Sequence, residues 1–271
     1  MICFPNAKIN LGLNIISKRP DGYHNIETVF YPVNLSDALE IVPAKDKGGV
    51  FKQTGISVDG DPQSNLVMQA YRMIQQVSEL PEIDIYLRKN IPFGAGLGGG
   101  SSDAAFMLKL LNDFANLNLL DEQLEEFAAR IGADCSFFIR NRPVFAEGIG
   151  NLFTPIDLSL EGYYLVLVKP DIHVSTKDAY ANVTPESPDE SIINIIQQPV
   201  STWKDKLVND FEESVFPLFP AIGEIKQKLY DNGALYASMT GSGSSVFGIF
   251  EEEKELKELF PDSLVYCIVL F

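Results

Sequence analysis

The sequence predicts a mixed fold of strands and helices, built as one large domain or two domains of ordinary size. The chain has 271 residues, and domains commonly have roughly 100–200. Apolar residues make up 46% of the chain and charged residues 21%, which suits a packed core and disfavours general disorder. The order of the expected strands and helices differs before and after Gly150. We therefore expect one domain over residues 1–155 and a second over residues 156–271.

The first strand is predicted by alternation. Apolar residues at positions 9, 11 and 13 alternate with Lys8 and Asn10, which therefore share one face. Pro20, Asp21 and Gly22 then form a turn signal. The same periodicities predict the other N-terminal elements: strands over 26–33, 38–42 and 83–88, a loop or hairpin over 45–60, and helices over 65–77, 104–115 and 121–132.

We expect Ser101 and Ser102 to cap the helix over 104–115. The C-terminal part of the chain also shows both the strand and the helix periodicity. Past residue 160 the predicted elements are strands over 163–168, 235–239, 245–250 and 264–270, and helices over 175–182, 221–230 and 252–260.

The charge balance restricts the partners. The formal net charge is −16, and an acidic surface repels nucleic-acid backbones and anionic membranes, so we expect neither as a partner. The longest apolar runs, such as residues 163–168, are far shorter than the roughly 20 residues that span a bilayer. The N-terminus lacks a basic segment before an apolar run. We expect a cytoplasmic protein that is a monomer or a weak homodimer.

Cysteine and histidine usage argues against several kinds of site. The three cysteines, Cys3, Cys135 and Cys267, are far apart and form no Cys-x-x-Cys pair, so neither a disulfide framework nor a zinc site is indicated. Only two histidines are present, His24 and His173, which gives poor support to histidine-rich metal chemistry or a Ser-His-Asp triad.

The glycine-rich segment after the strand over 83–88 predicts an anion site. Glycines let the backbone approach a ligand closely, and the first N–H groups of the following helix are unpaired and point at the anion. The hydroxyls of Ser101 and Ser102 can bond a phosphate oxygen or ligate a Mg²⁺ held mainly by phosphates. No other metal ligand is assigned.

Two familiar nucleotide loops fit this segment poorly. The spacing of Gly94, Gly96 and Gly99 matches a dinucleotide fingerprint, but an acidic strand end should follow within ~20 residues, and the region of Asp121 looks like a helix start. A Walker A loop is excluded because no Gly-Lys-Ser/Thr is present. A cation from elsewhere must then assist the transferred phosphoryl group. Lys8 is the best candidate, and Asp134 is a candidate base or electrostatic partner.

Motifs along nearly the whole chain resemble the GHMP kinases. They occur in the expected order: Pro5-Asn6-Ala7-Lys8-Ile9-Asn10-Leu11, then Pro92 to Ser102, then Gly132-Ala133-Asp134, then Gly241-Ser242-Gly243-Ser244. Arg19-Pro20-Asp21-Gly22-Tyr23-His24 and Asn209-Asp210-Phe211-Glu212 resemble a member whose acceptor is a cytidine diphosphate. The resemblance implies an α+β fold of two lobes, an N-terminal lobe like the second domain of ribosomal protein S5 and a ferredoxin-like C-terminal lobe.

The resemblance also implies an activity and its residues. ATP, with Mg²⁺, would phosphorylate a hydroxyl of a small-molecule cytidine diphosphate substrate, and Lys8 and Asp134 would be the catalytic pair. The implied ATP-binding residues are Asn65, Leu66, Pro92, Phe93, Gly94, Ala95, Gly96, Leu97, Gly98, Gly99, Gly100, Ser101 and Ser102. The implied substrate-binding residues are Asn10, Tyr23, His24, Thr176 and Tyr180, the rings of Tyr23, His24 and Tyr180 being able to stack on or bond a base.

Two departures and three rivals accompany this interpretation. Ala95 stands where a glycine is frequent and needs ordinary dihedrals, and Asp103 adds a negative charge that suits the helix dipole but must face away from phosphate or toward Mg²⁺. The rivals are another GHMP kinase acting on a sugar, homoserine or mevalonate, a nucleotide-binding regulator without turnover, and an RNA-binding module, which the net charge of −16 disfavours.

Overall fold

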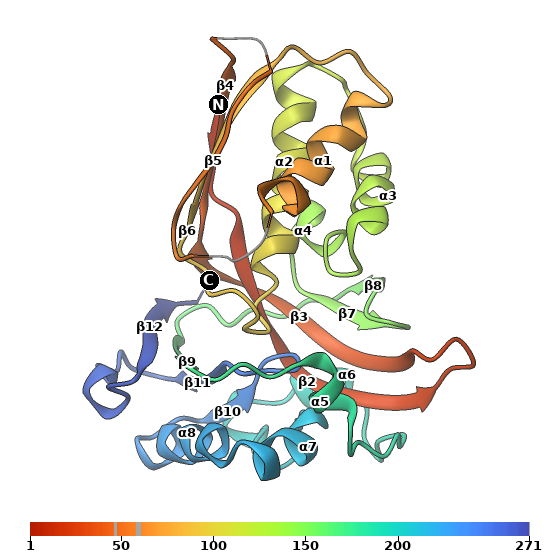
Figure 1. Cartoon of the computed structure of the whole chain (residues 1–271). Coiled ribbons are helices and arrows are strands. Elements are labelled where there is room, and N and C mark those ends of the chain that lie inside the picture. The colour runs from red at the N-terminus through yellow and green to blue at the C-terminus, as the bar shows by residue number, and fades with distance from the viewer. Residues whose placement is uncertain (46–47, 58–60, 271) are drawn as a thin grey trace. The chain divides into compact units, whose positions relative to one another are not determined.

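The structure, a computed structural model, describes residues 1–45, 48–57 and 61–270. Its chain divides into two compact units, whose elements are labelled in Figure 1. Unit 1 comprises Met1–Ala7, Leu35–Phe93 and Gly98–Arg142, and unit 2 comprises Lys8–Asn34, Gly94–Leu97 and Pro143–Phe271. Part of the loop predicted over 45–60 lies outside the described residues.

A four-stranded sheet forms one layer of unit 1, in the order β1-β4-β6-β5. Its strands are β1 (Ile2–Cys3), β4 (Ala38–Pro43), β5 (Phe51–Gly55) and β6 (Ile83–Lys89). β4 pairs antiparallel with β1 and β6, whereas β5 runs parallel to β6. Leu39, Ile41 and Ile85 are buried while the alternating residues Glu40 and Tyr86 are exposed, so only one face of this sheet belongs to the core.

Helices cover that buried face (Figure 1). They are α1 (Leu66–Gln75), α2 (Gly99–Phe114), α3 (Asp121–Ile131) and the short α4 (Phe137–Arg140). α2 packs against α1 and α3 and contacts β4. Ala104, Leu108 and Leu111 lie on one side of α2 and are fully buried, which is the helical spacing predicted from the sequence.

The capping prediction for α2 is wrong. The helix begins at Gly99, and its N-cap is Gly98, which has a φ of 69°. Ser101 and Ser102 therefore lie inside the first turn rather than before it. The left-handed conformation is open to glycine at little cost, so the chain turns into the helix earlier than a serine cap would allow.

Unit 2 holds two further four-stranded sheets. The first has the order β2-β3-β7-β8 and contains β2 (Asn6–Lys18), β3 (His24–Ser36), β7 (Val144–Glu147) and β8 (Leu152–Pro155). β2 is buried on both faces, so that Lys8 and Asn10 are only 4% and 2% exposed. Two polar side chains are thus enclosed within a predominantly apolar strand, which requires partners for both.

The second sheet of unit 2 is antiparallel, with the order β10-β11-β9-β12. Its strands are β9 (Tyr164–Pro170), β10 (Tyr236–Met239), β11 (Val246–Phe250) and β12 (Ser263–Val269), and the helices of this unit are α5 (Thr176–Tyr180), α6 (Ile192–Ile196), α7 (Phe211–Leu218) and α8 (Pro220–Asp231). α8 packs on β10 and β11. Val166, Val246, Leu229 and Ile222 are fully buried in the resulting core. Trp203, the chain's one tryptophan, is 1% exposed in unit 2.

The helix predicted over 252–260 does not form. The structure has only a short 3-10 turn there, Lys257–Leu259. Glu251, Glu252, Glu253 and Glu255 form an acidic run in which neighbouring like charges oppose a helix. No helix among the described residues is both long and apolar enough to cross a membrane.

Candidate active site

The glycine loop runs from Pro92 to Ser102 and crosses from one unit to the other. Gly94–Leu97 belongs to unit 2, and the residues on either side belong to unit 1. Gly94, Gly96 and Gly98 have φ values of 60°, 74° and 69°, a region that other residues rarely adopt. Ala95 does not share this positive φ, so its side chain is accommodated without backbone strain.

In unit 1, the first turn of α2 presents unpaired backbone donors. Ser102 N already donates to Gly98 O at 2.9 Å, and the N–H groups before it are those that a helix leaves without intrahelical acceptors. Ser102 Oγ is fully buried and has no hydrogen-bond partner among the residues that the structure describes. Leu66 lies beside this turn, since a Cβ added to Gly100 would lie 3.6 Å from Leu66 Cδ1. Asn65 caps α1, its side chain accepting from Val67 N at 2.9 Å.

Asp134 lies in unit 1, in the turn that precedes α4. The neighbouring Cys135 is buried, and α4, which follows it, packs against α2. Burial raises the pKa of the Cys135 thiol to about 11, the hydroxyl of Ser101 opposes that shift, and the charge of Asp134 adds to it. The turn carrying Asp134 therefore lies beside the first turn of α2, at the end of the glycine loop.

In unit 2, β2 presents Lys8 and Asn10 to the middle of the same loop. Lys8 Nζ donates to Asn10 Oδ1 at 2.7 Å and to Gly96 O at 3.1 Å. The ammonium also lies 4.7 Å from the centre of the Phe30 ring, a favourable cation–π position. Lys8 N donates to Leu97 O at 3.0 Å. The lysine is thus held against the loop by both its backbone and its side chain.

Two of the three aromatic residues predicted to bind the substrate base are in direct contact. The rings of His24 and Tyr180 are stacked, with centroids 4.6 Å apart and an interplanar angle of 18°. The edge of Tyr180 meets Phe211 at 4.7 Å. Burial, together with the charge of Lys18, lowers the pKa of His24 below its ordinary value, so its imidazole is neutral near pH 7.

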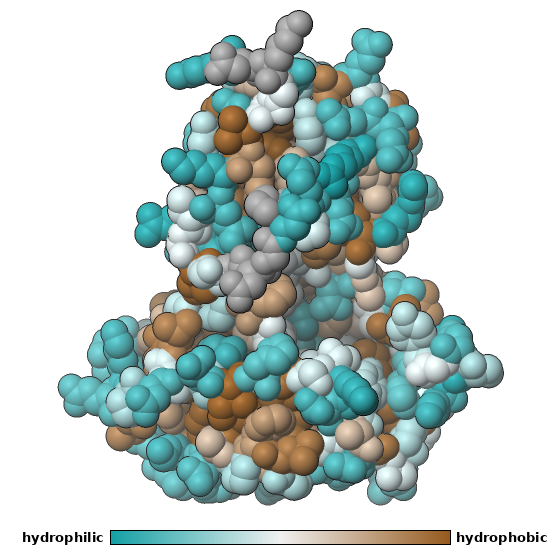
Figure 2. Space-filling model, viewed as in Figure 1, coloured by the Kyte–Doolittle hydropathy of each residue, from teal (hydrophilic) through white to brown (hydrophobic). Residues whose placement is uncertain are grey.

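Three other residues predicted to bind substrate or ATP, Tyr23, Phe93 and Thr176, are exposed. Tyr23 is 62% exposed and Phe93 is 65% exposed. Figure 2 shows one face of the molecule, on which hydrophilic and hydrophobic residues are interspersed. Thr176 is exposed at the start of α5, whose cap is Ser175, accepting from Asp178 N at 3.1 Å.

Asp103 is buried in unit 1, where it pairs with Lys89. Its Oδ2 accepts from Lys89 Nζ at 2.6 Å, and Lys89 also donates to Asp37. Asp37 Oδ1 accepts from Ile91 N at 2.9 Å and from Asn90 N. All three charged side chains are at least 95% buried. Burial raises the pKa of Asp103 strongly, Lys89 opposes the shift, and the charge of Asp37 adds to it.

The sequence predicted no role at the site for three residues of unit 2, His173, Asn209 and Thr240. A Cβ added to Gly94 would lie 3.6 Å from His173 Nδ1, although no motif around His173 indicated a place near the loop. Thr240 Oγ1 donates to Gly96 O at 3.1 Å, and Asn209 Nδ2 donates to Gly241 O at 2.9 Å. The Gly-Ser-Gly-Ser motif after Thr240 and the Asn-Asp-Phe-Glu motif that starts at Asn209 were the usable signals.

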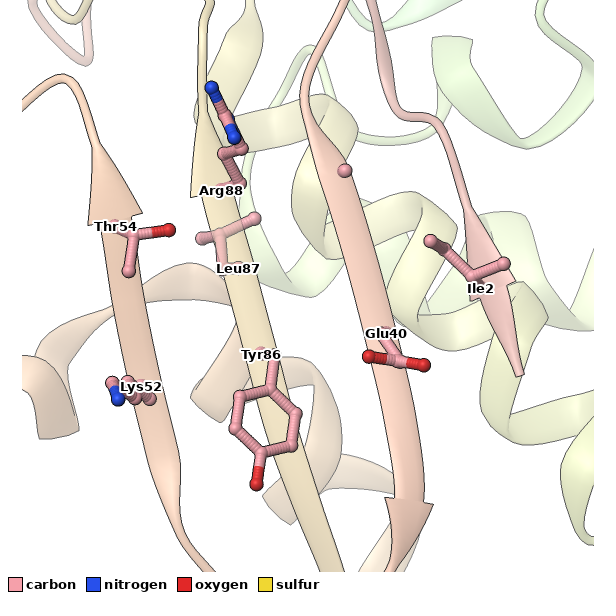
Figure 3. A pocket seen from close by; sticks show the side chains of 8 residues that line it. Ile2, Glu40, Lys52, Thr54, Tyr86, Leu87 and Arg88 are labelled. Atoms are coloured by element: carbon pink, nitrogen blue, oxygen red, sulfur yellow. The ribbon is translucent and has the colours of Figure 1, made fainter.

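A shallow pocket of about 280 Å³ lies on the outer face of the unit 1 sheet. Figure 3 shows Tyr86 between Glu40 of β4 and Lys52 of β5, with Arg88 further along β6. None of the predicted site residues lines this pocket. Among residues 1–45, 48–57 and 61–270, no group of three or more His, Cys, Asp or Glu side chains is arranged to hold a metal ion.

Comparison with solved structures shows the same fold in known kinases. A solved 4-(cytidine 5'-diphospho)-2C-methyl-D-erythritol kinase is similar over 100% of this chain and 99% of its own, with a TM-score of 0.87 and 30% identity. A solved mevalonate kinase is similar over 100% of this chain and 99% of its own, with a TM-score of 0.75 and 16% identity, a likeness that concerns the fold alone. The mixed two-domain kinase fold is therefore confirmed.

Sequence comparison identifies closer relatives. Two protein-family models match the chain, GHMP kinases N terminal domain over residues 65–142 and GHMP kinases C terminal over residues 192–260. The 4-diphosphocytidyl-2-C-methyl-D-erythritol kinase of Bacteroides fragilis is 61% identical over 96% of this chain and 95% of its own length. The relative of that name in Parabacteroides distasonis is 61% identical over 98% of both chains. The chain belongs to the GHMP kinase family, within its group of 4-diphosphocytidyl-2-C-methyl-D-erythritol kinases.

Proposed function

We propose that the protein transfers the γ-phosphoryl group of ATP to the 2-hydroxyl of 4-diphosphocytidyl-2-C-methyl-D-erythritol, a step of non-mevalonate isoprenoid precursor synthesis. The observation that carries the proposal is the position of Lys8. Its ammonium is held between Asn10 Oδ1 and Gly96 O, at the middle of a glycine loop that lacks a lysine of its own. Phosphoryl transfer needs a fixed cation near the transferred group, and Lys8 supplies one in unit 2.

The loop itself is suited to a triphosphate. Positive φ values at Gly94, Gly96 and Gly98 bring the backbone close to a ligand, and the first N–H groups of α2 offer donors aligned with the helix dipole. We assign the phosphates to residues 92–102. Asn65 and Leu66, beside the first turn of α2, are assigned to the adenine.

A magnesium ion fits this loop through the phosphates. Ser102 Oγ is a buried hydroxyl without a hydrogen-bond partner among the described residues, and Mg²⁺ prefers oxygen ligands supplied by one or two protein groups together with phosphates and water. Ser102 would hold the ion from the protein side. When bound, Mg²⁺ neutralises negative charge on the phosphates.

The acceptor is assigned to aromatic and polar residues of unit 2. The neutral imidazole of His24 has one donor and one acceptor nitrogen, which suits the edge of a cytosine, and Tyr23 and Tyr180 offer ring faces for stacking. A base could lie between His24 and Tyr180 only after these two stacked rings separate. Thr176 and Asn10 are assigned to the rest of the acceptor. Asp134 takes the proton of the attacking hydroxyl or orients that hydroxyl.

Formation of ADP with the purified acceptor, ATP and Mg²⁺ tests the proposal. Lys8→Ala and Asp134→Ala should each lower kcat by about 100-fold or more while ATP still binds. Lys52→Ala, which removes an exposed lysine on the outer sheet face of unit 1, is the matched control and should leave kcat unchanged.

The same assay separates the rivals. Turnover of galactose, homoserine or mevalonate, but not of the cytidine diphosphate, would replace this substrate with that of another GHMP kinase. Binding of ATP without turnover of any acceptor would favour a nucleotide-binding regulator. Near-parental kcat in both Lys8→Ala and Asp134→Ala would remove the catalytic assignment.

A further inference from the structure

Thr240 lies between Lys8 and the Gly-Ser-Gly-Ser segment of unit 2, residues 241–244. This threonine directly precedes Gly241 and is fully buried. Its Oγ1 accepts from Asn10 N at 3.1 Å, and it lies 3.1 Å from Gly96 O and 3.3 Å from Asn10 Oδ1 as a donor. Gly96 O and Asn10 Oδ1 each also accept from Lys8 Nζ. The Thr240 hydroxyl therefore contacts two acceptors of the ammonium.

The amide of Asn10 is oriented from its other side. Asn10 Nδ2 donates to Thr28 Oγ1 at 3.0 Å, and Thr28 Oγ1 donates its own proton to Gly12 O at 2.5 Å. This arrangement directs the amide oxygen toward Lys8 and Thr240. Because Asn10 and Thr28 are 2% and 0% exposed, water does not compete for these groups.

The backbone around Thr240 is fixed by Asn209. Asn209 Nδ2 donates to Met239 O at 2.7 Å and to Gly241 O at 2.9 Å, the carbonyls of the residues on either side of Thr240. Thr240 N donates to Ser245 O at 3.0 Å. A Cβ at Gly96 would lie 2.0 Å from Thr240 O, so glycine is required there for the two segments to meet.

We propose that Thr240 is a positioning residue for Lys8: its hydroxyl accepts from Asn10 N and donates its one proton to Gly96 O or Asn10 Oδ1, two oxygens that accept from the catalytic ammonium. This inference rests on the proposed function, because it presupposes that Lys8 acts on the transferred phosphoryl group. Asn209 takes part indirectly by holding the main chain on both sides of Thr240. The Asn-Asp-Phe-Glu motif, which starts at Asn209, thereby acquires a physical role at the site.

A hydroxyl-specific set of variants tests the proposal. Thr240→Val keeps the shape of the side chain but removes its hydroxyl, and we expect kcat to fall by about 10–100-fold, as for other small displacements of a catalytic group. KM for ATP and for the acceptor should change by less than about 3-fold, since Thr240 is assigned to neither ligand. Thr240→Ser, which retains the hydroxyl, should restore kcat to within about 3-fold of the parent.

Ser245→Ala is the matched control. Ser245 lies five residues further along the chain, is fully buried like Thr240, and its hydroxyl has no hydrogen-bond partner among the described residues. We expect parental kcat from this variant. Equal losses of kcat in Thr240→Val and Ser245→Ala would overturn the proposal. If Thr240→Val does not fold, Thr240→Ala removes the same hydroxyl without adding bulk.

Two further measurements distinguish loss of the position of Lys8 from a general disturbance of the fold. In a Lys8→Arg background, Thr240→Val should lower kcat by less than about 3-fold, because residues that act as a unit are not additive. Pulse labelling with acetic anhydride, read by mass spectrometry, should modify Lys8 several-fold faster in Thr240→Val than in the parent. Full additivity together with unchanged labelling of Lys8 would refute the role of Thr240. Parental turnover by Lys8→Ala would instead refute the proposed function.

Discussion

Replacing the two buried aspartates of unit 1, Asp37 and Asp103, should change the stability of the protein by unequal amounts. Asp37→Ala removes the carboxylate that accepts from Lys89 and from the N–H groups of Asn90 and Ile91. Asp103→Asn changes a carboxylate that accepts from Lys89 through Oδ2 and whose Oδ1 has no hydrogen-bond partner among the described residues. Although both aspartates contact the same lysine, only Asp37 also caps the backbone where the glycine loop begins.

The contacts set the expected magnitudes. Asp37→Ala leaves the buried N–H of Ile91 and the partly buried N–H of Asn90 without their acceptor, and a buried N–H left unpaired costs about 1–3 kcal/mol. It also breaks one buried ion pair, while Lys89 keeps Asp103. We expect a loss of about 3–5 kcal/mol, against the 5–15 kcal/mol typical of a folded domain. Asp103→Asn keeps an oxygen for Lys89. At pH 6, below the raised pKa of Asp103, it replaces one uncharged side chain by another. Its effect at pH 6 should stay within about 1 kcal/mol.

The pH dependence follows from the raised pKa of Asp103. Because burial raises this pKa in the folded state above its unfolded value, ionisation of Asp103 favours unfolding, and stability falls as the pH rises from about 4 through the raised pKa. Asp103→Asn removes this loss, so its stability relative to the parent should increase with pH.

Urea denaturation followed by far-UV circular dichroism at pH 6 and pH 8.5 measures both effects. Hydrogen exchange of β6 and α2 amides localises them in unit 1. The reasoning fails if Asp37→Ala costs less than about 1 kcal/mol, if Asp103→Asn is the more damaging change, or if its advantage shrinks as the pH rises.

Three further outcomes are expected. Gly96→Ala should lower kcat by about 100-fold or more, because the new Cβ would lie 2.0 Å from Thr240 O; Gly22→Ala, at a φ of 90° with nothing within 4 Å, should cost only about 1 kcal/mol of stability and leave kcat intact. The acceptor KM should rise as the pH falls through the pKa of His24, which burial lowers below its ordinary value, because the neutral imidazole then gains a proton; the same rise in His24→Gln would contradict this assignment. Tyr180→Leu should raise the acceptor KM by about 10-fold, the value of one base stacking contact, with the ATP KM unchanged; equal changes in both constants would argue against a stacking role.

Local patterns predicted most of the elements. Strict alternation identified β2 and placed Lys8 and Asn10 on one face, where their side chains are 2.7 Å apart. Helical spacing identified α2 and α3 to within a few residues. Where charge opposed the pattern, as in the acidic run before Phe260, the predicted helix was wrong.

Long-range contacts could not be predicted in the same way. Asp37, Lys89 and Asp103 come from three separate segments, and no local periodicity connects them. Thr240 lies 144 positions from Gly96, so its contact with the loop follows only from the fold. The sequence indicated that Asp103 must face away from phosphate or toward Mg²⁺. It did not indicate that Asp103 would pair with the buried Lys89.

The single tryptophan gives the protein an intrinsic optical probe. Trp203 is buried in unit 2, where its Nε1 donates to Gln198 O at 2.9 Å and its ring meets Tyr236 edge-on at 5.7 Å. Its emission therefore reports the local environment of unit 2, whereas circular dichroism sums the helices and strands of both units. Coincident unfolding curves from the two signals would mean one cooperative transition, and separated curves would resolve the stability of each unit without any label.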